Sequence, residues 1–261
     1  MAEPAMQNGV PRSGERQKRL LAIVDGDSAN LYYASIVLQR LEYNIHTAKS
    51  AEDVLELLDV AQPALVMTEV SLPGMDGIEL LKKIKRNPRT FAIPVIILTS
   101  SKDPEAKEAC LREHCAAYLQ KPVEPEVLYA AIQKVTETTP RQYIRLATCL
   151  NVMVGEGREA EESVIKNYIT ALSEQGMFVN TENPIPVGLA IPITIFLETS
   201  RIKVEGMVLY SFDRGKGPLR TAGMGVKFVR IGSEDQVLIR QFIRRQITKG
   251  LTMGQLGGTI F

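Results

Sequence analysis

Short apolar segments alternate with segments of helical periodicity across the first half of the chain. This alternation limits the fold to the few architectures in which strands and helices alternate. Apolar runs typical of strands buried on both faces occupy residues 20–24, 64–67, 95–98 and 118–119. Helix-start signals stand between them, at Ser28, the Ser50/Asp53 pair, the Asp76/Glu79 pair, Pro104 and Pro125. These runs mark four of the five short strands that we predict to alternate with five helices, and this order indicates a doubly wound parallel sheet with helices on both faces.

Polar side chains follow the apolar strands where each one ends. Ligands of such folds bind at the carboxyl ends of the strands, because the connecting loops meet there. A helix cap or a solvated loop position explains any one of these residues more simply. The whole set comes from four strand ends, however, and therefore predicts a site: Asp25, Asp27, Glu69, Thr99, Ser100 and Lys121.

Four sequence segments match one known family in order. They are AIVDGD at residues 22–27, VSLPGMDG at 70–77, VIILTS at 95–100 and YLQKP at 118–122. Residues 20–136 thus resemble the receiver domain of two-component response regulators, a flavodoxin-like fold. The resemblance implies phosphorylation of an aspartate, Mg²⁺ held by an acidic pair, and a switch that involves Thr99 and Tyr118.

Two positions depart from this pattern. The acceptor position, directly before Val70, is Glu69, and the second member of the acidic pair is Gly26. Mg²⁺ demands near-octahedral oxygen ligands, so we expect at most a weakened magnesium site at Asp25 and Asp27. The longer Glu69 side chain is expected to carry a permanent negative charge towards Thr99 and Lys121. We interpret this half as a pseudo-receiver that is locked in an active-like state or serves as a docking module.

The second half shows strand patterns without intervening helices. Strands are predicted at residues 149–154, 163–170, 176–181, 191–198, 202–211 and 223–229, with a turn at 155–157. This spacing favours a small antiparallel six-stranded barrel. An amphipathic helix is predicted at 234–248, where we expect it to cover the barrel. The resulting organisation is a flexible segment 1–18, a receiver-like domain 19–137, a barrel domain 138–249 and a tail 250–261.

Arg141 and Arg145 lie four residues apart before the first of these strands, and Ser173 and Gly176 lie on a predicted turn. Guanidinium groups bind phosphate oxygens and the O6/N7 edge of guanine in a planar, bidentate manner. Taken alone, two linker arginines are most simply solvated charges.

Residues 141–248 also resemble a family, the PilZ domain, whose members bind the bacterial second messenger cyclic di-GMP. Its signature RxxxR is complete at Arg141 and Arg145. In the second part, [DN]xSxxG, Ser173 and Gly176 match but the first position is Ala171. The resemblance implies a cyclic di-GMP site at Arg141, Arg145, Ser173 and Gly176, with weaker binding than the full signature gives.

Composition narrows the function classes. The chain has 31 Lys+Arg against 30 Asp+Glu, and residues 1–140 contain 16 basic and 19 acidic side chains, a net of −3. Residues 141–261 therefore carry +4, which favours an anionic partner for the second half. Three cysteines (Cys110, Cys115 and Cys149) and two histidines without metal-ligand spacing argue against a disulfide framework and a zinc site. We expect no enzyme, no resident cofactor, no nucleic-acid partner and no membrane span, and a cytoplasmic location.

Three functions remain open. The favoured one is a cyclic di-GMP effector that controls motility, pili or exopolysaccharide through a protein partner, as a monomer or a homodimer. The second is a ligand-independent adaptor, towards which Ala171, Gly26 and Glu69 count. The third is a genuine phosphorylated response regulator.

Overall fold

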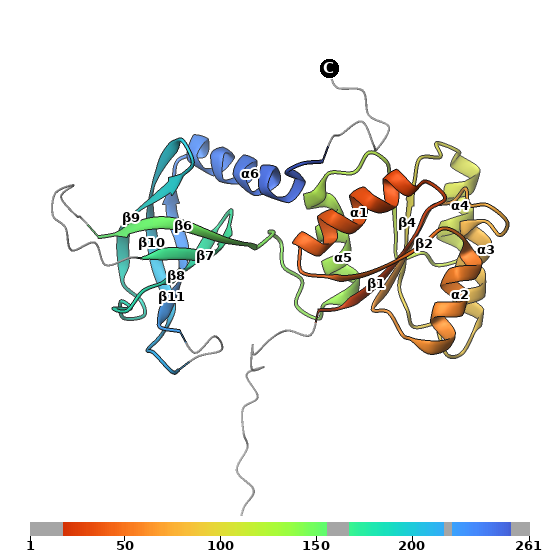
Figure 1. Cartoon of the computed structure of the whole chain (residues 1–261), viewed down its shortest axis with the longest axis horizontal. Helices are drawn as coiled ribbons and strands as arrows, with labels where there is room; N and C mark the ends of the chain where they lie inside the picture. The colour runs from red at the N-terminus through yellow and green to blue at the C-terminus, as the bar shows by residue number, and fades with distance from the viewer. Residues whose placement is uncertain (1–17, 156–166, 217–220, 252–261) are drawn as a thin grey trace, which may run out of the picture. The chain divides into compact units, whose positions relative to one another are not determined.

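The computed structural model describes residues 18–155, 167–216 and 221–251, which form two compact units (Figure 1). One is an α/β unit of Lys18–Leu146 together with the chain from Gln236 onward, and the other is a barrel unit within Ala147–Asp235. None of the helices in the described ranges combines the length and apolar character that a membrane span requires.

The α/β unit confirms the predicted doubly wound sheet. Its five parallel strands are ordered β2-β1-β3-β4-β5, and Figure 1 shows α1 and α5 on one face of the sheet and α2, α3 and α4 on the other. The strands are β1 Leu20–Val24, β2 Asn44–Ala48, β3 Leu65–Thr68, β4 Val95–Thr99 and β5 Ala117–Gln120. The helices are α1 Ser28–Arg40, α2 Ala51–Val60, α3 Gly77–Arg86, α4 Pro104–Arg112 and α5 Pro125–Thr136.

The helix starts follow the sequence signals with one correction. Ser50 and Asp53 form the predicted capping box of α2, and the Asp76 side chain caps α3 by accepting from the Glu79 amide. The cap of α1, however, is Asp27 and not Ser28, because the Asp27 carboxylate accepts a hydrogen bond from the Ala29 amide. Both residue types favour this position, so sequence alone does not choose between neighbours.

Strand β2 had no apolar run to mark it. It lies at the edge of the sheet and pairs only with β1, and its first four residues are exposed or half-buried. An edge strand with one partner needs few apolar side chains, so its sequence resembles that of a loop.

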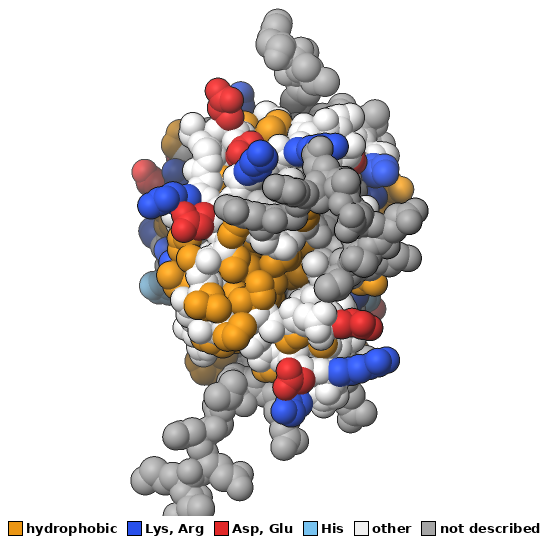
Figure 2. Space-filling model, turned by 90° about the vertical axis from the view of Figure 1, so that its left-hand side faces the viewer, with side chains coloured by type: hydrophobic (Ala, Val, Ile, Leu, Met, Phe, Trp, Pro, Cys, Tyr) orange, Lys and Arg blue, Asp and Glu red, His pale blue; other side chains and the backbone are white. Residues whose placement is uncertain are grey.

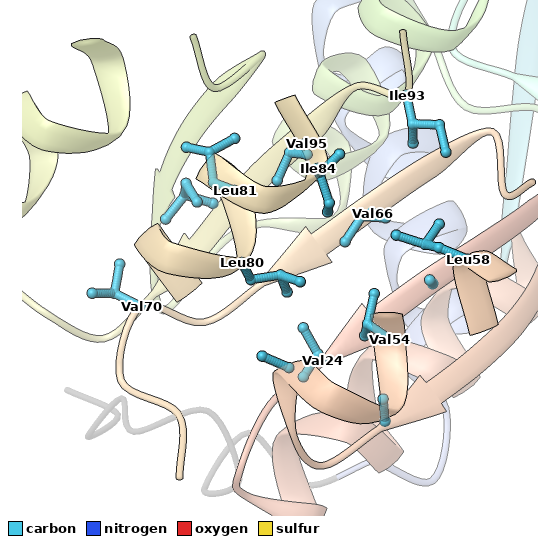
Figure 3. Packing of buried hydrophobic residues seen from close by; sticks show 14 of the residues in the cluster. Val24, Val54, Leu58, Val66, Val70, Leu80, Leu81, Ile84, Ile93 and Val95 are labelled. Atoms are coloured by element: carbon cyan, nitrogen blue, oxygen red, sulfur yellow. The ribbon is translucent and has the colours of Figure 1, made fainter. Parts of the chain in front are cut away.

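One face of the sheet packs against α2, α3 and α4 through a continuous apolar cluster (Figure 3). Val24 and Val66 of the sheet lie opposite Leu80 of α3 and Val54 of α2. Burial of this cluster stabilises the unit, because each buried aliphatic side chain contributes about 1.5–3 kcal/mol.

The barrel unit confirms six antiparallel strands in a closed barrel of order β10-β11-β8-β7-β6-β9. They are β6 Leu146–Val154, β7 Tyr168–Ser173, β8 Gly176–Asn180, β9 Ala190–Leu197, β10 Ser200–Phe212 and β11 Gly223–Ile231. The predicted strand 163–170 begins outside the described residues. Side chains alternate along β9 and β10, so Ile191, Ile193 and Ile195 are buried while outward positions carry exposed apolar groups. Figure 2 shows hydrophobic side chains gathered on one face of the molecule. The exposed large hydrophobic residues on and beside β9 and β10 include Leu189, Met207 and Leu209.

Helix α6 spans Ser233–Thr248. We predicted that it covers the barrel, but its residues from Gln236 onward group with the α/β unit. Arg40 of α1 donates to the carbonyl oxygen of Ile247 at 2.6 Å, and Arg244 pairs with carboxylates at the start of α5. The buried side chains of the helix are Ile239, Phe242, Ile243 and Ile247. The sequence pattern put Val237, Leu238, Phe242 and Ile243 on the apolar side of the helix. Of these, Phe242 and Ile243 are buried but Val237 is exposed, and the pattern does not say which domain covers the buried face.

A glycine fixes the approach of α3 to the end of β3. A Cβ atom at Gly77 would lie 2.0 Å from the carbonyl oxygen of Glu69, while the Gly77 amide donates to the Val70 carbonyl at 2.8 Å. We therefore expect Gly77→Ala to lower the free energy of unfolding by about 1–3 kcal/mol in urea denaturation, although alanine is the better helix former.

The matched control is Gly232→Ala. A Cβ atom there meets nothing closer than 3.6 Å, so the same substitution should change stability by less than about 0.5 kcal/mol. Equal effects of the two substitutions would contradict the steric argument.

Candidate functional site

The parallel register brings the predicted polar residues to one edge of the α/β sheet. Val24 of β1 pairs with Thr68 of β3, so the next residues, Asp25 and Glu69, leave their strands side by side. Thr99 ends β4, and its carbonyl accepts a hydrogen bond from the Lys121 amide at 2.8 Å. Four strand ends therefore converge as predicted.

The Glu69 carboxylate has four hydrogen-bond donors. Its Oε1 atom accepts from the Thr99 hydroxyl and, at 2.7 Å, from the Val70 amide. Its Oε2 atom accepts from Lys121 Nζ at 2.9 Å and from the Ser100 amide at 3.0 Å. The longer side chain thus reaches Thr99 and Lys121, as expected. The two backbone donors were not predicted, because amide direction is set by loop conformation and leaves no side-chain signal.

Lys121 joins Glu69 to a second carboxylate. Its Nζ atom also donates to Asp25 Oδ2, and Asp25 Oδ1 accepts from the Asp27 amide at 2.8 Å. The Lys121 side chain is only 3% exposed, and those of Asp25 and Glu69 are 8% exposed. The ion pairs are therefore buried, and removal of one partner leaves another charge without compensation. We refer to Asp25, Glu69, Thr99 and Lys121 as the carboxylate network.

The environment of Glu69 favours its ionised form. Burial alone would raise the pKa of the Glu69 carboxyl, but hydrogen bonds from Thr99 and Lys121, the Lys121 charge and the Ser100 amide together lower it below its ordinary value. Glu69 is thus a fixed negative charge at neutral pH, held by donors that are already in place.

The donor set does not fit a Mg²⁺ centre. Both oxygens of Asp25 and both oxygens of Glu69 are engaged by protein donors, and Gly26 supplies no ligand. Asp27, the substitute considered from the sequence, uses Oδ1 to cap α1. The cavity beside Asp25, Glu69 and Lys121 measures about 10 Å³, which is at most the size of one water molecule. Across the described residues no three His, Cys, Asp or Glu side chains are grouped to hold a metal ion.

Tyr118, the second switch candidate, lies on β5 and is half-buried against the apolar cluster of α2, α3 and α4. Lys107 Nζ lies 5.9 Å from the centroid of its ring. Burial raises the pKa of the Tyr118 hydroxyl, with further contributions from nearby anionic groups that include Glu69. The phenol therefore stays neutral at physiological pH.

The arginines of the second motif lie on the segment between α5 and β6. Arg145 is exposed and Arg141 is half-buried. The Arg141 amide donates to Gln133 Oε1 at 3.1 Å, and Gln133 Nε2 donates to the Tyr43 hydroxyl at 2.9 Å. Burial raises the pKa of Tyr43 to about 12, so this hydroxyl remains a neutral partner. The backbone at Arg141 is thereby fixed to α5.

Ser173 and Gly176 flank the predicted turn, now seen between β7 and β8. Ser173 Oγ donates to the Gly176 carbonyl at 3.0 Å. A Cβ atom at Gly176 would lie 2.4 Å from the Val226 carbonyl oxygen of β11, so glycine is required for strand packing. Ala171 follows a bulge in the β7–β8 ladder and pairs with Phe178. Ser173 and Gly176 belong to the barrel unit, whereas Arg141 and Arg145 belong to the α/β unit. That the four residues form one site therefore stays a prediction.

The low pKa of Glu69 makes stability depend on pH. Since the carboxyl is more acidic in the folded protein than its ordinary value of 4.5, its contribution to stability is present above this pH and lost as the pH falls through the lower folded value. In denaturant titrations from pH 7 to pH 3, Glu69→Gln should show a shallower loss of unfolding free energy than the wild type. The same substitution at exposed Glu56 is the control. Parallel pH curves for wild type and Glu69→Gln would contradict this account.

Comparisons with known proteins agree with this architecture. Residues 21–133 match the response regulator receiver domain model and residues 139–245 match the PilZ domain model. The transcriptional regulatory protein AfsQ1 of Streptomyces coelicolor is 34% identical over 47% of this chain and 53% of its own length. An uncharacterised 14.6 kDa protein of Leptolyngbya boryana is 31% identical over 44% of this chain and 87% of its own length.

Among solved structures, a putative response regulator from Chloroflexus aurantiacus is 31% identical, with a TM-score of 0.45 over 46% of this chain and 98% of that one. This chain spans about half the length of the AfsQ1 relative, and all three similarities cover less than half of this chain. Both matched families are signalling domains and not enzyme families. The chain therefore contains a response regulator receiver domain at residues 21–133, followed by a PilZ domain at residues 139–245.

Proposed function

We propose that this protein is a cytoplasmic cyclic di-GMP effector whose receiver domain works without phosphorylation and whose output passes through a protein partner. The observation that carries the proposal is the Glu69 carboxylate, which already has the contacts that an acquired negative charge would need. Thr99, Lys121 and two backbone amides bind it in the absence of any modification.

The hydrogen bonds of the carboxylate network also oppose phosphoryl transfer to Glu69. The acceptor would be a glutamate whose two oxygens are occupied, and Mg²⁺ would have to displace Lys121 or the Asp27 amide from Asp25. Phosphoryl transfer depends on metal ions and positioned cations to neutralise the developing charge. Because protein donors already engage both oxygens of Asp25, a metal ion would have to compete with them before it could supply this stabilisation.

We expect incubation of the full chain with Mg²⁺ and acetyl phosphate to leave its intact mass unchanged. The double variant Glu69→Asp/Gly26→Asp should gain a phosphoryl adduct, because it shortens the acceptor and restores a second carboxylate. A Cβ atom at residue 26 would meet Pro73 Cδ at 3.3 Å, so the pocket must yield by only a few tenths of an ångström. A stoichiometric adduct on the wild type would overturn the proposal for this domain.

The phosphates and guanines of cyclic di-GMP are groups that the arginines of the second domain can bind. Its two phosphates and two guanines require charge together with planar donors, which arginine supplies and lysine does not. Arg141 and Arg145 complete the RxxxR signature, and the PilZ match spans both of them and the Ser173–Gly176 turn. Because the Arg141 backbone is fixed to Gln133, ligand binding would act on a segment that is already tied to α5.

Arg141→Lys and Arg145→Lys should each reduce the affinity for cyclic di-GMP about ten- to a hundredfold in calorimetry, since a charge-assisted hydrogen bond contributes roughly 1.5–3 kcal/mol. Ala171→Asp should tighten binding by restoring the missing acceptor. Arg112→Lys, in an exposed ion pair with Glu108, is the control and should leave the affinity unchanged.

An adaptor function is the second candidate. Ser173 and Gly176 each have a structural role in the barrel, in the turn and against β11, which they would keep without any ligand. If calorimetry shows no heat and residues 138–146 gain no protection from hydrogen exchange at high cyclic di-GMP concentration, the adaptor replaces the effector.

A further inference from the structure

Helix α6 is bound to the receiver domain by hydrogen bonds and ion pairs with α1 and the start of α5. Arg244 forms two hydrogen bonds of 3.1 Å with the Glu126 carboxylate and an ion pair of 2.8 Å with Glu124. Two residues separate Lys121, in the network, from Glu124, which directly precedes α5. These bonds, together with the Arg40 bond to the Ile247 carbonyl, we call the α6 clasp.

The carboxylate of Glu124 binds Arg244 of α6 and does not cap α5. Glu124 occupies the N-cap position of α5, where Ser, Thr, Asp or Asn normally accepts from the first turn, yet its side chain makes no capping bond. It bonds to Arg244 instead. Both carboxylates of the clasp thus lie on the first turn of α5 and its cap, and they move with the Lys121–Glu124 segment.

The second attachment leads to the same network through α1. Asp27, whose amide binds Asp25, caps the start of α1, and Arg40 at its end binds the last turn of α6. Tyr33 and Val37, which share a stripe of α1 with Arg40, are 5% and 1% exposed. The neighbours that affect the pKa of Tyr33, beyond its burial, include Glu124, Arg244 and Glu126. This stripe of α1 therefore lies beside the clasp.

At its other end α6 is connected to the barrel by one residue, because β11 ends at Ile231 and α6 begins at Ser233. A change in how α6 is held would therefore reach the end of β11 in the PilZ domain through a single residue. We propose that α6 is a coupling strap: the carboxylate network sets the positions of α1 and the start of α5, these hold α6 through the clasp, and α6 transmits their state to the barrel. This inference goes beyond the proposed function and needs neither phosphorylation nor cyclic di-GMP.

Hydrogen exchange of the full chain, read by mass spectrometry over residues 239–247, tests the strap. Arg244→Gln should increase exchange there roughly three- to tenfold, as expected for a partly exposed ion-pair cluster. Arg244→Glu should increase it further, and Glu126→Arg added to Arg244→Glu should restore much of the protection by reversing the pair. Arg112→Gln, which breaks an exposed ion pair on α4, should have no effect. Unchanged protection in Arg244→Gln would overturn the clasp.

A second experiment tests whether the carboxylate network is coupled to α6. Glu69→Gln keeps the shape of the side chain but weakens its hydrogen bond with Lys121. It should increase exchange of residues 239–247 although the hydrogen-bond partners of Glu69 are Val70, Thr99, Ser100 and Lys121 and not residues of α6. If the strap couples the two sites, the effects of Glu69→Gln and Arg244→Gln will not multiply in the double variant, and the deviation should exceed about threefold. Multiplicative effects, or a Glu69→Gln chain that exchanges like the wild type in α6, would overturn the coupling and leave the proposed function standing.

Discussion

The ammonium group of Lys121 lies between the carboxylates of Asp25 and Glu69, and the ends of β1, β3 and β5 are joined through it. A buried ion pair is costly unless each charge is fully hydrogen-bonded, and here the additional donors are Thr99 and the amides of Val70, Ser100 and Asp27. These donors reach the carboxylates only while the parallel register is intact. The site therefore depends on the sheet, and the loops that carry the site depend on the ion pairs for their positions.

The sequence predicted those parts of the structure that follow from periodicity or from local chemistry. The apolar strands and the capping box at Ser50 are of this kind, because burial on both faces and a cap each require particular residue types. Where several residue types satisfy the same requirement, prediction failed. Asp27 and Ser28 are both good caps, and edge strand β2 needs so little burial that nothing distinguishes it from a loop.

Other contacts had no sequence signal at all. Arg244 and Glu126 are 118 residues apart, and an arginine on the polar side of a helix indicates only that this side is charged. The assignment of α6 to the barrel rested on the family resemblance, and the PilZ match does extend to residue 245, whereas from Gln236 onward the helix groups with the α/β unit. Similarly, the spacing of Ser173 and Gly176 matches a ligand motif and a tight β-hairpin equally well, because both require a small residue close to the backbone.

The closure of the barrel limits how a protein partner can bind to it. Six strands in a closed ring leave every strand with two neighbours, so an incoming chain finds no unpaired strand edge along which to extend the sheet. A protein that binds the barrel would then contact side chains on its outer surface. Leu189, Met207 and Leu209 are exposed on and beside β9 and β10. Affinity at such a surface would come from shape and apolar area and not from backbone hydrogen bonds, so a few outward-facing side chains would contribute most of it.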